Sequence, residues 1–493
     1  MIRDIFENIK SKNDIRQNLI KLRAELKEGH NKSALLYQIG GDYTIFDRLL
    51  SSEDAKVRKN TALIMGELAV PSFLGKLMEA YKRETQLFVR SSYLTAIKGL
   101  DYKSLLPELK ERLAALGNLE TDEADKKHIN EEIRVLSDLI ISAEGIKRHV
   151  FTGYNVPSKL VLLTNRNFVP VTLGQIKDAK AREFNAGIIV KTADLKPVLS
   201  IRTYSELLFM LEDIKTCGMD ASMAAKSLAG SSLLDFLKDR HEKGAPFYFR
   251  IELKSKAALD KKSAFTKKLG LELERLTGRE LINSTSNYEF EIRLIENKEG
   301  SYNLLIKLFT IMDDRFSYRK NAIATSIQPV NAALAAALAK EYLKEGAQSL
   351  DPFCGVGTML IERHKLVEAG TMYGLDIYGD AIEKAKENSK AARIIIHYIN
   401  RDFFDFKHEY LFDEIITDMP RVMGHKEEAE IYELHRRFFL KAKEHLKKDG
   451  ILILYSHNRD FIKKLINGKF YRLEREYEIS KKEGAYLFII RSI

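Results

Sequence analysis

The spacing of apolar residues changes along this chain and predicts three kinds of region. Up to about residue 145, apolar residues recur at i, i+3 and i+4 with almost no proline, which is typical of amphipathic helices. From residue 146, runs of β-branched residues broken by Asn, Pro and Gly alternate with helical segments, as in small α/β modules. From residue 321 to the end, strands and amphipathic helices alternate, which predicts a doubly wound α/β domain.

The helical region contains an internal repeat. The segment KVRKNTALIMGEL, from Lys56, aligns with FVRSSYLTAIKGL, from Phe88, at an offset of 32 residues. The pair resembles HEAT repeats, whose second helix opens with a valine and an arginine, and whose hairpins stack because one alone cannot bury its apolar face. We therefore expect residues 1–145 to form a HEAT-like helical repeat domain. A coincidental helical bundle is the alternative.

Two α/β modules are expected in the middle of the chain. In residues 146–226, β-branched runs lead into a helix rich in acids and bases, then a strand at AGIIVKTA and a helix over TYSELLFMLEDI. In residues 227–320, the segments PFYFRIELKS, YEFEIRLIE and YNLLIKLFTI predict strands. A long helix is expected from Ala257 to about Leu276.

The net charge of the chain indicates which class of partner it binds. The formal net charge is +10 and the pI about 9.1, which favours an anionic partner such as nucleic acid. Residues 221–320 carry 19 Lys and Arg against 14 Asp and Glu. Lysines at high density on a helix and its leading turn suit a phosphate backbone, and a solvated helix face is the alternative. The candidate contacts are Lys254, Lys256, Lys261, Lys262, Lys267 and Lys268.

Two cysteines, Cys217 and Cys354, are too few for a disulfide framework or a zinc site. No metal cluster or catalytic triad is apparent in the sequence. Apolar runs stay short of the roughly 20 residues that a membrane span needs, and the N-terminal residues lack a signal-peptide core. We therefore expect a soluble, cytoplasmic protein.

The stretch AQSLDPFCGVGTMLIERHKLVEAGTMYGLDIYGD, residues 347–380, predicts half of a nucleotide-binding βαβ unit. Gly355 and Gly357 permit a tight turn and close approach of a ligand, and Thr358 opens the following helix. Asp376 ends the second strand, where such folds hold ribose hydroxyls.

Two classes of cofactor can use this geometry. The dinucleotide fingerprint requires a third glycine, but Leu360 occupies that position. Asp351, at the end of the first strand, suits a ligand with a cationic head. S-adenosylmethionine has a ribose, an adenine, an ammonium and a sulfonium, and no phosphate, so the sequence favours it.

Acids recur at the ends of the predicted strands in this region. Asp351, Asp376, Asp402 and Asp418 each end or follow a strand, and ligands of such sheets bind outside the carboxyl ends of the strands. We therefore expect these four side chains on one edge of the sheet. The remaining elements are predicted as helices at 378–390, 427–446 and 458–466 and strands at 394–399, 412–417, 450–455, 470–477 and 485–490.

The sequence DPFCGVGTMLIE resembles motif I of the class I RNA methyltransferases that carry a THUMP domain. That family modifies guanosines of tRNA and rRNA, typically at the exocyclic amine. An ordinary strand, turn and helix of another α/β protein is the alternative. The resemblance implies a Rossmann-like class I methyltransferase domain at 321–493, a ferredoxin-like module at 146–226 and a THUMP-like RNA-binding domain at 227–320.

The resemblance also implies roles for individual residues. The ribose contacts Asp376, the adenine contacts Ile377 and Asp402, and the methionine end contacts the polar residues that precede the first helix. The implied cofactor-binding set is Ser326, Gln328, Asp351, Phe353, Cys354, Gly355, Gly357, Thr358, Asp376, Ile377, Asp402 and Phe403.

The family's catalytic loop, by contrast, is altered. Family members use an Asp or Asn, two prolines and an aromatic residue that stacks on the base, whereas this chain has Asp418, Met419, Pro420 and Arg421. The resemblance makes Asp418, Pro420 and Arg421 the catalytic candidates. Arg421 can stack its guanidinium on a base, or else the target atom differs from guanine N2, or the site no longer methylates. Tyr432, His425 and His457 lie nearby, and such histidines are usually solvated.

Three functions compete. The first is an S-adenosylmethionine-dependent methyltransferase that acts on a base of tRNA or rRNA, with a possible protein partner on the helical repeats. The second is a non-catalytic, cofactor-binding scaffold for RNA or protein, which the altered loop favours. The third is a protein methyltransferase with the repeats as its substrate platform, which the basic middle region disfavours.

Overall fold

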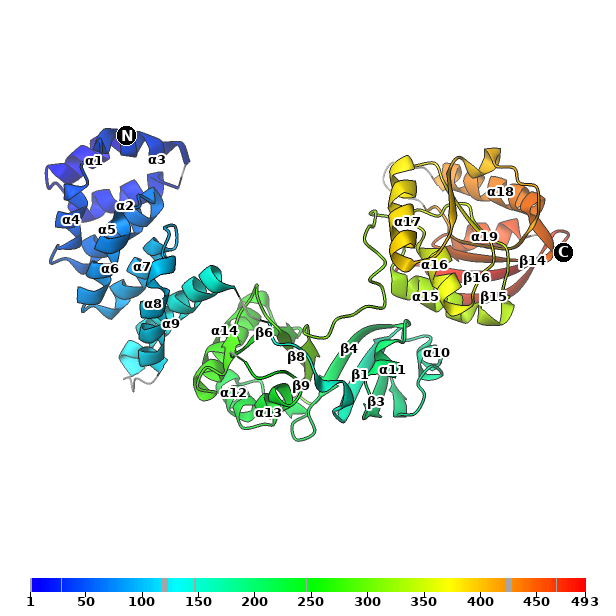
Figure 1. The fold of residues 1–493 in the computed structure, drawn as a ribbon, viewed down its shortest axis with the longest axis horizontal. Coiled ribbons are helices and arrows are strands. Elements are labelled where there is room, and N and C mark those ends of the chain that lie inside the picture. Colours follow the sequence, from blue (N-terminus) through cyan, green and yellow to red (C-terminus); the bar gives the residue numbers. More distant parts are fainter. Residues whose placement is uncertain are drawn as a thin grey trace.

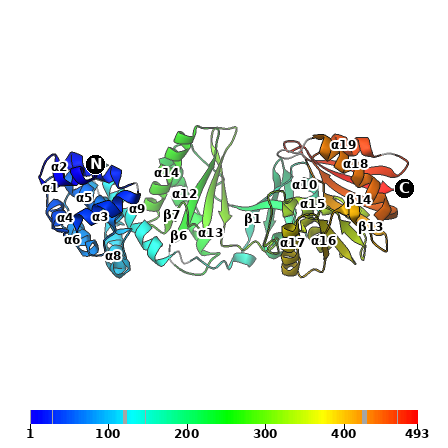
Figure 2. The ribbon, with the colours of Figure 1, turned by 90° about the horizontal axis from the view of Figure 1, so that it is seen from above.

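Three bodies follow one another along the chain in the computed structural model (Figures 1 and 2). It describes residues 2–27, 29–117, 123–145, 148–244, 246–421, 428–466 and 468–493. A helical array lies at one end, a sheet with helices occupies the middle, and a second sheet covered by helices lies at the other end. Among the described residues, no helix is both long and apolar enough to cross a membrane.

The first body is an array of helices joined by short turns. The two copies of the sequence repeat become α5 and α7, which pack side by side, and α7 packs in turn on α9. The helices are α1 (Ile2–Lys10), α2 (Ile15–Glu25), α3 (Gly29–Ile39), α4 (Thr44–Leu50), α5 (Ala55–Leu68), α6 (Phe73–Arg83), α7 (Leu87–Ile97), α8 (Leu106–Gly117) and α9 (Glu123–Glu144).

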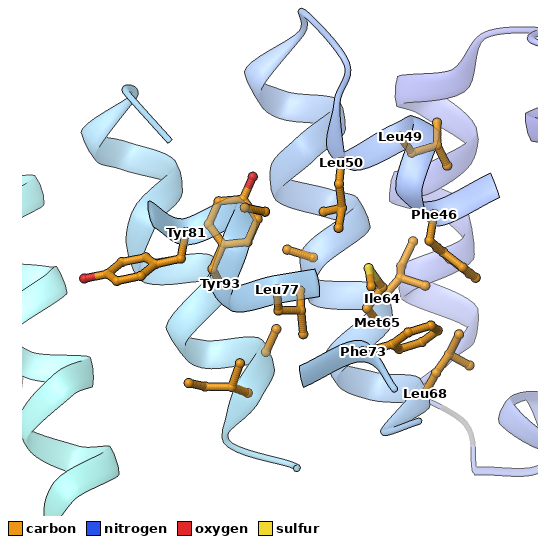
Figure 3. Close-up of a cluster of buried hydrophobic side chains, with 14 of the residues drawn as sticks. Phe46, Leu49, Leu50, Ile64, Met65, Leu68, Phe73, Leu77, Tyr81 and Tyr93 are labelled. Carbon is orange, nitrogen blue, oxygen red and sulfur yellow. The ribbon is translucent and has the colours of Figure 1, made fainter. Parts of the chain in front are cut away.

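Apolar side chains from neighbouring helices form the core of this array. Phe46 of α4 and Phe73 of α6 meet edge to face at 5.5 Å, with Met65 of α5 beside them (Figure 3). A Cβ on Gly66 would lie 2.6 Å from the Cα of Ala96, so α5 and α7 are in backbone contact and leave no room for a larger residue. The apolar residues that recur along each helix therefore pack against those of the neighbouring helices.

The arginine of each repeat copy binds a buried carboxylate. Arg58 donates from Nε and Nη2 to the two oxygens of Glu84, at 2.8 and 2.7 Å. Arg90 lies 3.8 Å from Glu132, which also accepts hydrogen bonds from Arg112 and Tyr81. Because both carboxylates are buried, each arginine replaces hydration that the acid loses on folding.

The second body is built on a nine-stranded sheet in the order β2-β3-β1-β4-β9-β8-β6-β7, with β5 paired to β9. Its strands are β1 (Ser158–Thr164), β2 (Lys180–Phe184), β3 (Gly187–Thr192), β4 (Tyr204–Met210), β5 (Thr216–Cys217), β6 (Phe247–Lys254), β7 (Leu281–Asn283), β8 (Phe290–Glu296) and β9 (Tyr302–Leu308). Its helices are α10 (Val169–Leu173), α11 (Lys196–Leu199), α12 (Ala221–Ala229), α13 (Leu233–Lys238) and α14 (Leu259–Leu276).

Three expectations for this body need correction. The boundary expected between residues 226 and 227 falls inside α12, and β4 and β9 join the two expected modules into one sheet. The helix expected over 203–214 is strand β4, and the charged helix expected before AGIIVKTA is the edge strand β2. Strand β4 places Phe209 in the main core on one face of the sheet and Leu208 in a small apolar cluster on the other, so its apolar residues do not alternate with polar ones.

The third body is a doubly wound domain, as the alternation of elements predicted. Its sheet has the order β12-β11-β10-β13-β14-β16-β15, and β16 runs antiparallel to both neighbours. The strands are β10 (Ser349–Asp351), β11 (Met372–Asp376), β12 (His397–Asn400), β13 (Phe412–Asp418), β14 (Leu446–Ser456), β15 (Tyr471–Ser480) and β16 (Ala485–Ser492). The helices are α15 (Pro329–Leu338), α16 (Thr358–Leu366), α17 (Gly379–Ala392), α18 (Glu428–His445) and α19 (Arg459–Leu465).

A buried ionic contact joins the second and third bodies. Arg202, in the loop before β4, donates from Nε and Nη2 to both carboxylate oxygens of Glu362 in α16, at 2.7 and 2.6 Å. The hydroxyl of Tyr318, in the connecting segment, donates to the same carboxylate at 2.6 Å. Helix α10 also packs on α15, which Figure 2 shows beside it. The middle sheet is therefore held in one orientation against the third body.

Replacing Arg202 with alanine should destabilise the protein by about 3 kcal/mol, because Glu362 has no exposed surface and would keep a charge without its cation. Urea unfolding, monitored by near-ultraviolet circular dichroism, measures the change in the free energy of unfolding.

Arg436→Ala is the matched control. Arg436 pairs with Glu433 on an exposed helix face, so its loss should cost less than about 0.5 kcal/mol. Equal effects of the two substitutions would show that the Arg202 contact does not hold the bodies together.

Candidate active site

The carboxyl ends of five adjacent parallel strands form one edge of the third body's sheet. Along this edge the order is β12, β11, β10, β13 and β14, all parallel. Asp376, Asp351 and Asp418 end β11, β10 and β13, while Asp402 follows β12 and His457 follows β14. Neighbouring strands lie about 4.8 Å apart, so the four acids expected at this edge are brought together in one row.

A cavity of about 410 Å³ lies over this row of acids. It is lined by residues of the glycine loop, of the segment before α15 and of the loop after β13. Among the candidate residues, those that line it are Ser326, Asp351, Phe353, Cys354, Gly355, Thr358, Asp376, Ile377, Asp402, Phe403, Asp418, Pro420 and Arg421.

Two candidates do not line the cavity. Gln328 precedes α15 with its side chain exposed, and its Oε1 accepts a hydrogen bond from Arg319 at 3.3 Å. Pro329 occupies the first turn of α15, and Gln328 is its N-cap residue. The expected cofactor contact of Gln328 stays a prediction. Gly357 lies beneath the loop, where a Cβ would meet the hydroxyl of Tyr398 at 2.1 Å. Gly357 therefore makes room for the loop to pack.

The glycine loop is tied to the second acid of the row. Gly355 has φ 51° and Gly357 has φ 82°, conformations that favour glycine. The backbone N–H of Gly355 donates to Asp376 Oδ2 at 2.9 Å, and the N–H of Tyr378 donates to Oδ1 at 2.9 Å. These bonds fix the carboxylate of Asp376 while leaving lone pairs for a ligand.

Asp351 is the most buried acid of the row. Burial raises the pKa of its carboxyl to about 8, although Thr417 and the Phe353 N–H donate to its Oδ1 at 2.5 and 3.1 Å. The nearby carboxylates of Asp418 and Asp376 raise the pKa further. A positive charge next to Asp351 would reverse this shift.

The cavity favours a cationic ligand. Burial also raises the pKa of Asp418 to about 7, with Arg421 acting against the shift. Among the described residues that line the cavity, four are aspartates and Arg421 is the one cation. The buried hydroxyl of Thr358 has no hydrogen-bond partner within the described chain, and it is available to a ligand.

The backbone of the loop after β13 is fixed from two sides. The N–H of Met419 donates to the carbonyl of Tyr455 at 2.8 Å, and His435 Nε2 donates to the carbonyl of Pro420 at 2.8 Å. His435 is completely buried in α18. Sequence reasoning missed His435, because nothing local in an amphipathic helix distinguishes a histidine that caps a distant loop.

Of the side chains expected near this loop, His457 is not a solvated surface residue. It is half-buried and accepts a hydrogen bond from Arg421 at 2.9 Å. Tyr432 packs edge to face on Phe461 of α19 at 5.1 Å. His425 lies outside the residues that the structure describes.

The six candidate lysines lie far from this cavity, in the second body. Lys254 ends β6, Lys256 lies in the following turn, and the other four are on α14. Five of them are exposed, while Lys262 is half-buried. None of the six forms an ion pair with a described residue, so five ammonium groups remain available to an anionic partner.

No group of three or more His, Cys, Asp or Glu side chains in the described part of the chain could hold a metal ion. Both cysteines are free and buried.

Comparison with known sequences relates this geometry to methyltransferases. Residues 318–482 match the family described as RMKL-like, methyltransferase domain. A tRNA (guanine(10)-N2)-dimethyltransferase of Methanothermobacter thermautotrophicus is 31% identical over 139 residues, which are 27% of this chain and 40% of that protein. The chain thus spans about two fifths of the length of this relative.

Solved structures share the fold at low identity. TrmN from Thermus thermophilus is 16% identical with a TM-score of 0.51, over 68% of this chain and 99% of that chain. The methyltransferase SMU.472, solved in complex with SAH, is 13% identical with a TM-score of 0.52, over 68% and 97%. Such coverage extends beyond residues 321–493. The chain therefore has the class I methyltransferase-like α/β fold, and residues 318–482 match the RMKL-like methyltransferase domain family.

Proposed function

We propose that the protein is an S-adenosylmethionine-dependent RNA methyltransferase that transfers a methyl group to a base of tRNA or rRNA. One observation carries the proposal: four carboxylates at adjacent strand ends line a cavity whose acceptor side has a fixed loop and an arginine. The curated relative acts on N2 of a tRNA guanine by its name, which supports the exocyclic amine of guanine as the acceptor.

The residues of the cavity fit S-adenosylmethionine. The fixed carboxylate of Asp376 can accept hydrogen bonds from both ribose hydroxyls, and Asp351 compensates the ammonium and sulfonium charges. Ile377 is 59% exposed at the cavity, which suits an apolar contact with adenine. Asp402 and Phe403 lie on the same side, and Thr358 offers the hydroxyl that has no protein partner.

Bound S-adenosylmethionine supplies an electrophilic methyl group and leaves as the neutral thioether. Asp418 lies next to Asp351 along the edge, so its carboxylate can accept hydrogens of the base amine and turn the nitrogen lone pair toward the methyl group. The carbonyl of Met419 is beside it, while His435 already occupies the carbonyl of Pro420. As the N–C bond forms, the proton that the amine loses passes to Asp418, whose pKa of about 7 suits a general base.

The other two bodies hold the RNA in this proposal. The middle sheet combines a ferredoxin-like part and a THUMP-like part that begins before α12, with the exposed lysines of α14 as phosphate contacts. The helical array acts as a HEAT-like platform for RNA or a protein partner. A cytoplasmic location follows from the proposed substrates.

A cofactor-binding scaffold is the second candidate. The loop after β13 has Met419 and Arg421 where the resembled family has a proline and an aromatic residue, and this favours a site that no longer methylates. The fixed backbone of the loop and the raised pKa of Asp418 favour the enzyme.

Affinity for S-adenosylmethionine should rise about tenfold or more between pH 6 and pH 8. The pKa of Asp351 is raised to about 8, so this carboxyl is protonated below pH 8 and must lose its proton when the cation binds. Isothermal titration calorimetry in buffers of different ionisation enthalpy measures both the affinity and the released proton.

Asp351→Asn should flatten this dependence, and the ratio of the two affinities cancels any titration of the ligand itself. Asp380→Asn is the matched control, because Asp380 is exposed on α17 and pairs with Lys384. A wild-type protein that bound no S-adenosylmethionine at any pH would overturn the proposed function.

Asp418→Ala should lower turnover about a hundredfold or more, the scale of losing one positioned electrostatic contact, with the affinity for the cofactor nearly intact. Transfer of radiolabelled methyl groups to unmethylated tRNA and rRNA measures the effect.

Asp418→Asn is the matched variant, since its amide oxygen still accepts a hydrogen bond but cannot take up a proton. Its turnover should lie between those of Asp418→Ala and the wild type. Full activity of Asp418→Ala would exclude the catalytic role, and a wild type that binds cofactor yet methylates no RNA would favour the scaffold.

Charge reversal at Lys261, Lys262, Lys267 and Lys268 should weaken RNA binding and make it less salt-dependent, because each lost phosphate contact lowers the slope by about one. Fluorescence anisotropy of labelled tRNA over a range of salt concentrations measures the slope.

Charge reversal at four lysines of the helical array, Lys56, Lys59, Lys98 and Lys103, is the control for total charge. If only the array variant flattened the slope, the RNA surface would lie on the helical array.

A further inference from the structure

The cation of the cavity is held in place by a histidine from the neighbouring strand. Arg421 Nη1 lies 2.9 Å from His457 Nε2, and His457 Nδ1 lies 3.0 Å from the carbonyl oxygen of Glu483. Arg421 follows β13, His457 follows β14, and Glu483 lies in the turn between β15 and β16. Three segments that are far apart in sequence therefore meet in one hydrogen-bonded chain.

The two partners of the imidazole determine its state. A guanidinium can only donate, so Nε2 must offer its lone pair to Arg421, and a carbonyl can only accept, so Nδ1 must carry the proton. His457 is therefore neutral in this arrangement. Burial lowers the pKa of His457, and the charge of Arg421 lowers it further.

Few charged or titratable groups face this imidazole. In the described chain they are Arg421 from the loop after β13, Glu483 from the β15–β16 turn and Tyr455 from β14, whose ring lies 5.8 Å away. Glu483 acts in the opposite direction to burial and to Arg421. A proton on Nε2 would point at the guanidinium, remove the acceptor and add a like charge.

Arg421 lies on the side of the cavity where a methyl acceptor must enter. Asp376 and Asp402, the proposed ribose and adenine contacts, lie on one side of Asp351 along the sheet edge. Asp418 lies on the other side, and Arg421 follows it three residues later. A guanidinium there can stack on the face of a base or donate to its carbonyl oxygen and ring nitrogens.

We propose that Arg421 contacts the target base and that His457 is a positioning residue that orients the Arg421 guanidinium for this contact. The inference rests on the proposed RNA methyltransferase function and adds a base-reading residue to it. The contact depends on a neutral His457, so base recognition is lost when this imidazole takes up a proton.

Kinetics of His457→Phe and His457→Gln test the proposal, with S-adenosylmethionine and an unmethylated tRNA fraction. Phenylalanine fills the space but offers no acceptor, so KM for tRNA should rise about tenfold or more, the effect of a displaced contact group, while cofactor affinity stays within about twofold. Glutamine has an oxygen that accepts from Arg421 and an NH₂ that donates to Glu483, so it should restore most of the loss. An unchanged KM in His457→Phe would overturn the proposal, and unchanged cofactor affinity shows that the domain is folded.

The pH profile separates positioning from simple packing. Glutamine does not titrate, and Asp418 is common to both proteins, so the ratio of wild-type to His457→Gln activity isolates the imidazole. This ratio should fall once the pH drops below the lowered pKa of His457, by about tenfold for each further unit. A ratio that stayed constant across the titration of His457, as followed by nuclear magnetic resonance, would show that His457 does not control the base contact by its charge.

Nuclear magnetic resonance of histidine-labelled protein tests the contact without any substrate. The His457 signal should show the Nδ1–H tautomer with a pKa below 6.5, and Arg421→Met should raise that pKa because a neighbouring cation is removed. An Nε2–H tautomer would overturn the contact itself. If the wild type methylated no RNA fraction, the proposed function would fail, and these spectra would still decide whether His457 holds Arg421.

Discussion

The burial of Asp351 is the constraint on which the rest of the third body depends. A carboxylate with only 1% of its surface exposed, beside two further acids, is costly to ionise without a cation next to it. The sheet imposes this arrangement, because parallel strands end at a common edge and each strand end carries an acid. A cationic, hydroxyl-rich ligand would offset the free-energy cost of ionising Asp351. The positions of the adjacent strand ends therefore favour a ligand of this kind.

Helix α16 transmits this geometry to the rest of the molecule. It begins at Thr358 in the cavity, and its consecutive residues Glu362 and Arg363 form buried ion pairs in different directions. Glu362 binds Arg202 of the middle sheet, whereas Arg363 binds Glu414 of β13, the strand that ends at Asp418. One helix thus fixes the glycine loop, strand β13 and the body with the exposed lysines relative to one another. The distance between the exposed lysines and the cavity is then a property of the fold.

Many elements of the third body and most of its candidate site residues could be predicted from the sequence. The predictions that failed did so for physical reasons. The glycine loop and the strand-terminal acids were predictable because their signals are local and the strand pattern of a doubly wound sheet is distinct. Strand β4 was mistaken for a helix because it packs apolar side chains on both faces of the sheet, Phe209 on one and Leu208 on the other, and so lacks alternation. The Arg202–Glu362 pair and the Arg421–His457 contact span 160 and 36 residues, so no local pattern predicts them. The exposed side chain of Gln328 accepts a hydrogen bond from Arg319, a contact that the sequence pattern did not indicate.

Two hydrogen bonds hold the altered loop after β13 in place. Its path is set by the Met419 N–H on Tyr455 and by His435 on the Pro420 carbonyl, which are backbone contacts. These contacts constrain the backbone and leave the side chain at position 421 free to differ without moving Asp418. A flexible arginine side chain loses conformational entropy when it binds a base. The hydrogen bond to His457 orders Arg421 before binding and so reduces that loss. The same fold can therefore keep the chemistry at Asp418 and exchange an aromatic contact for a charged one.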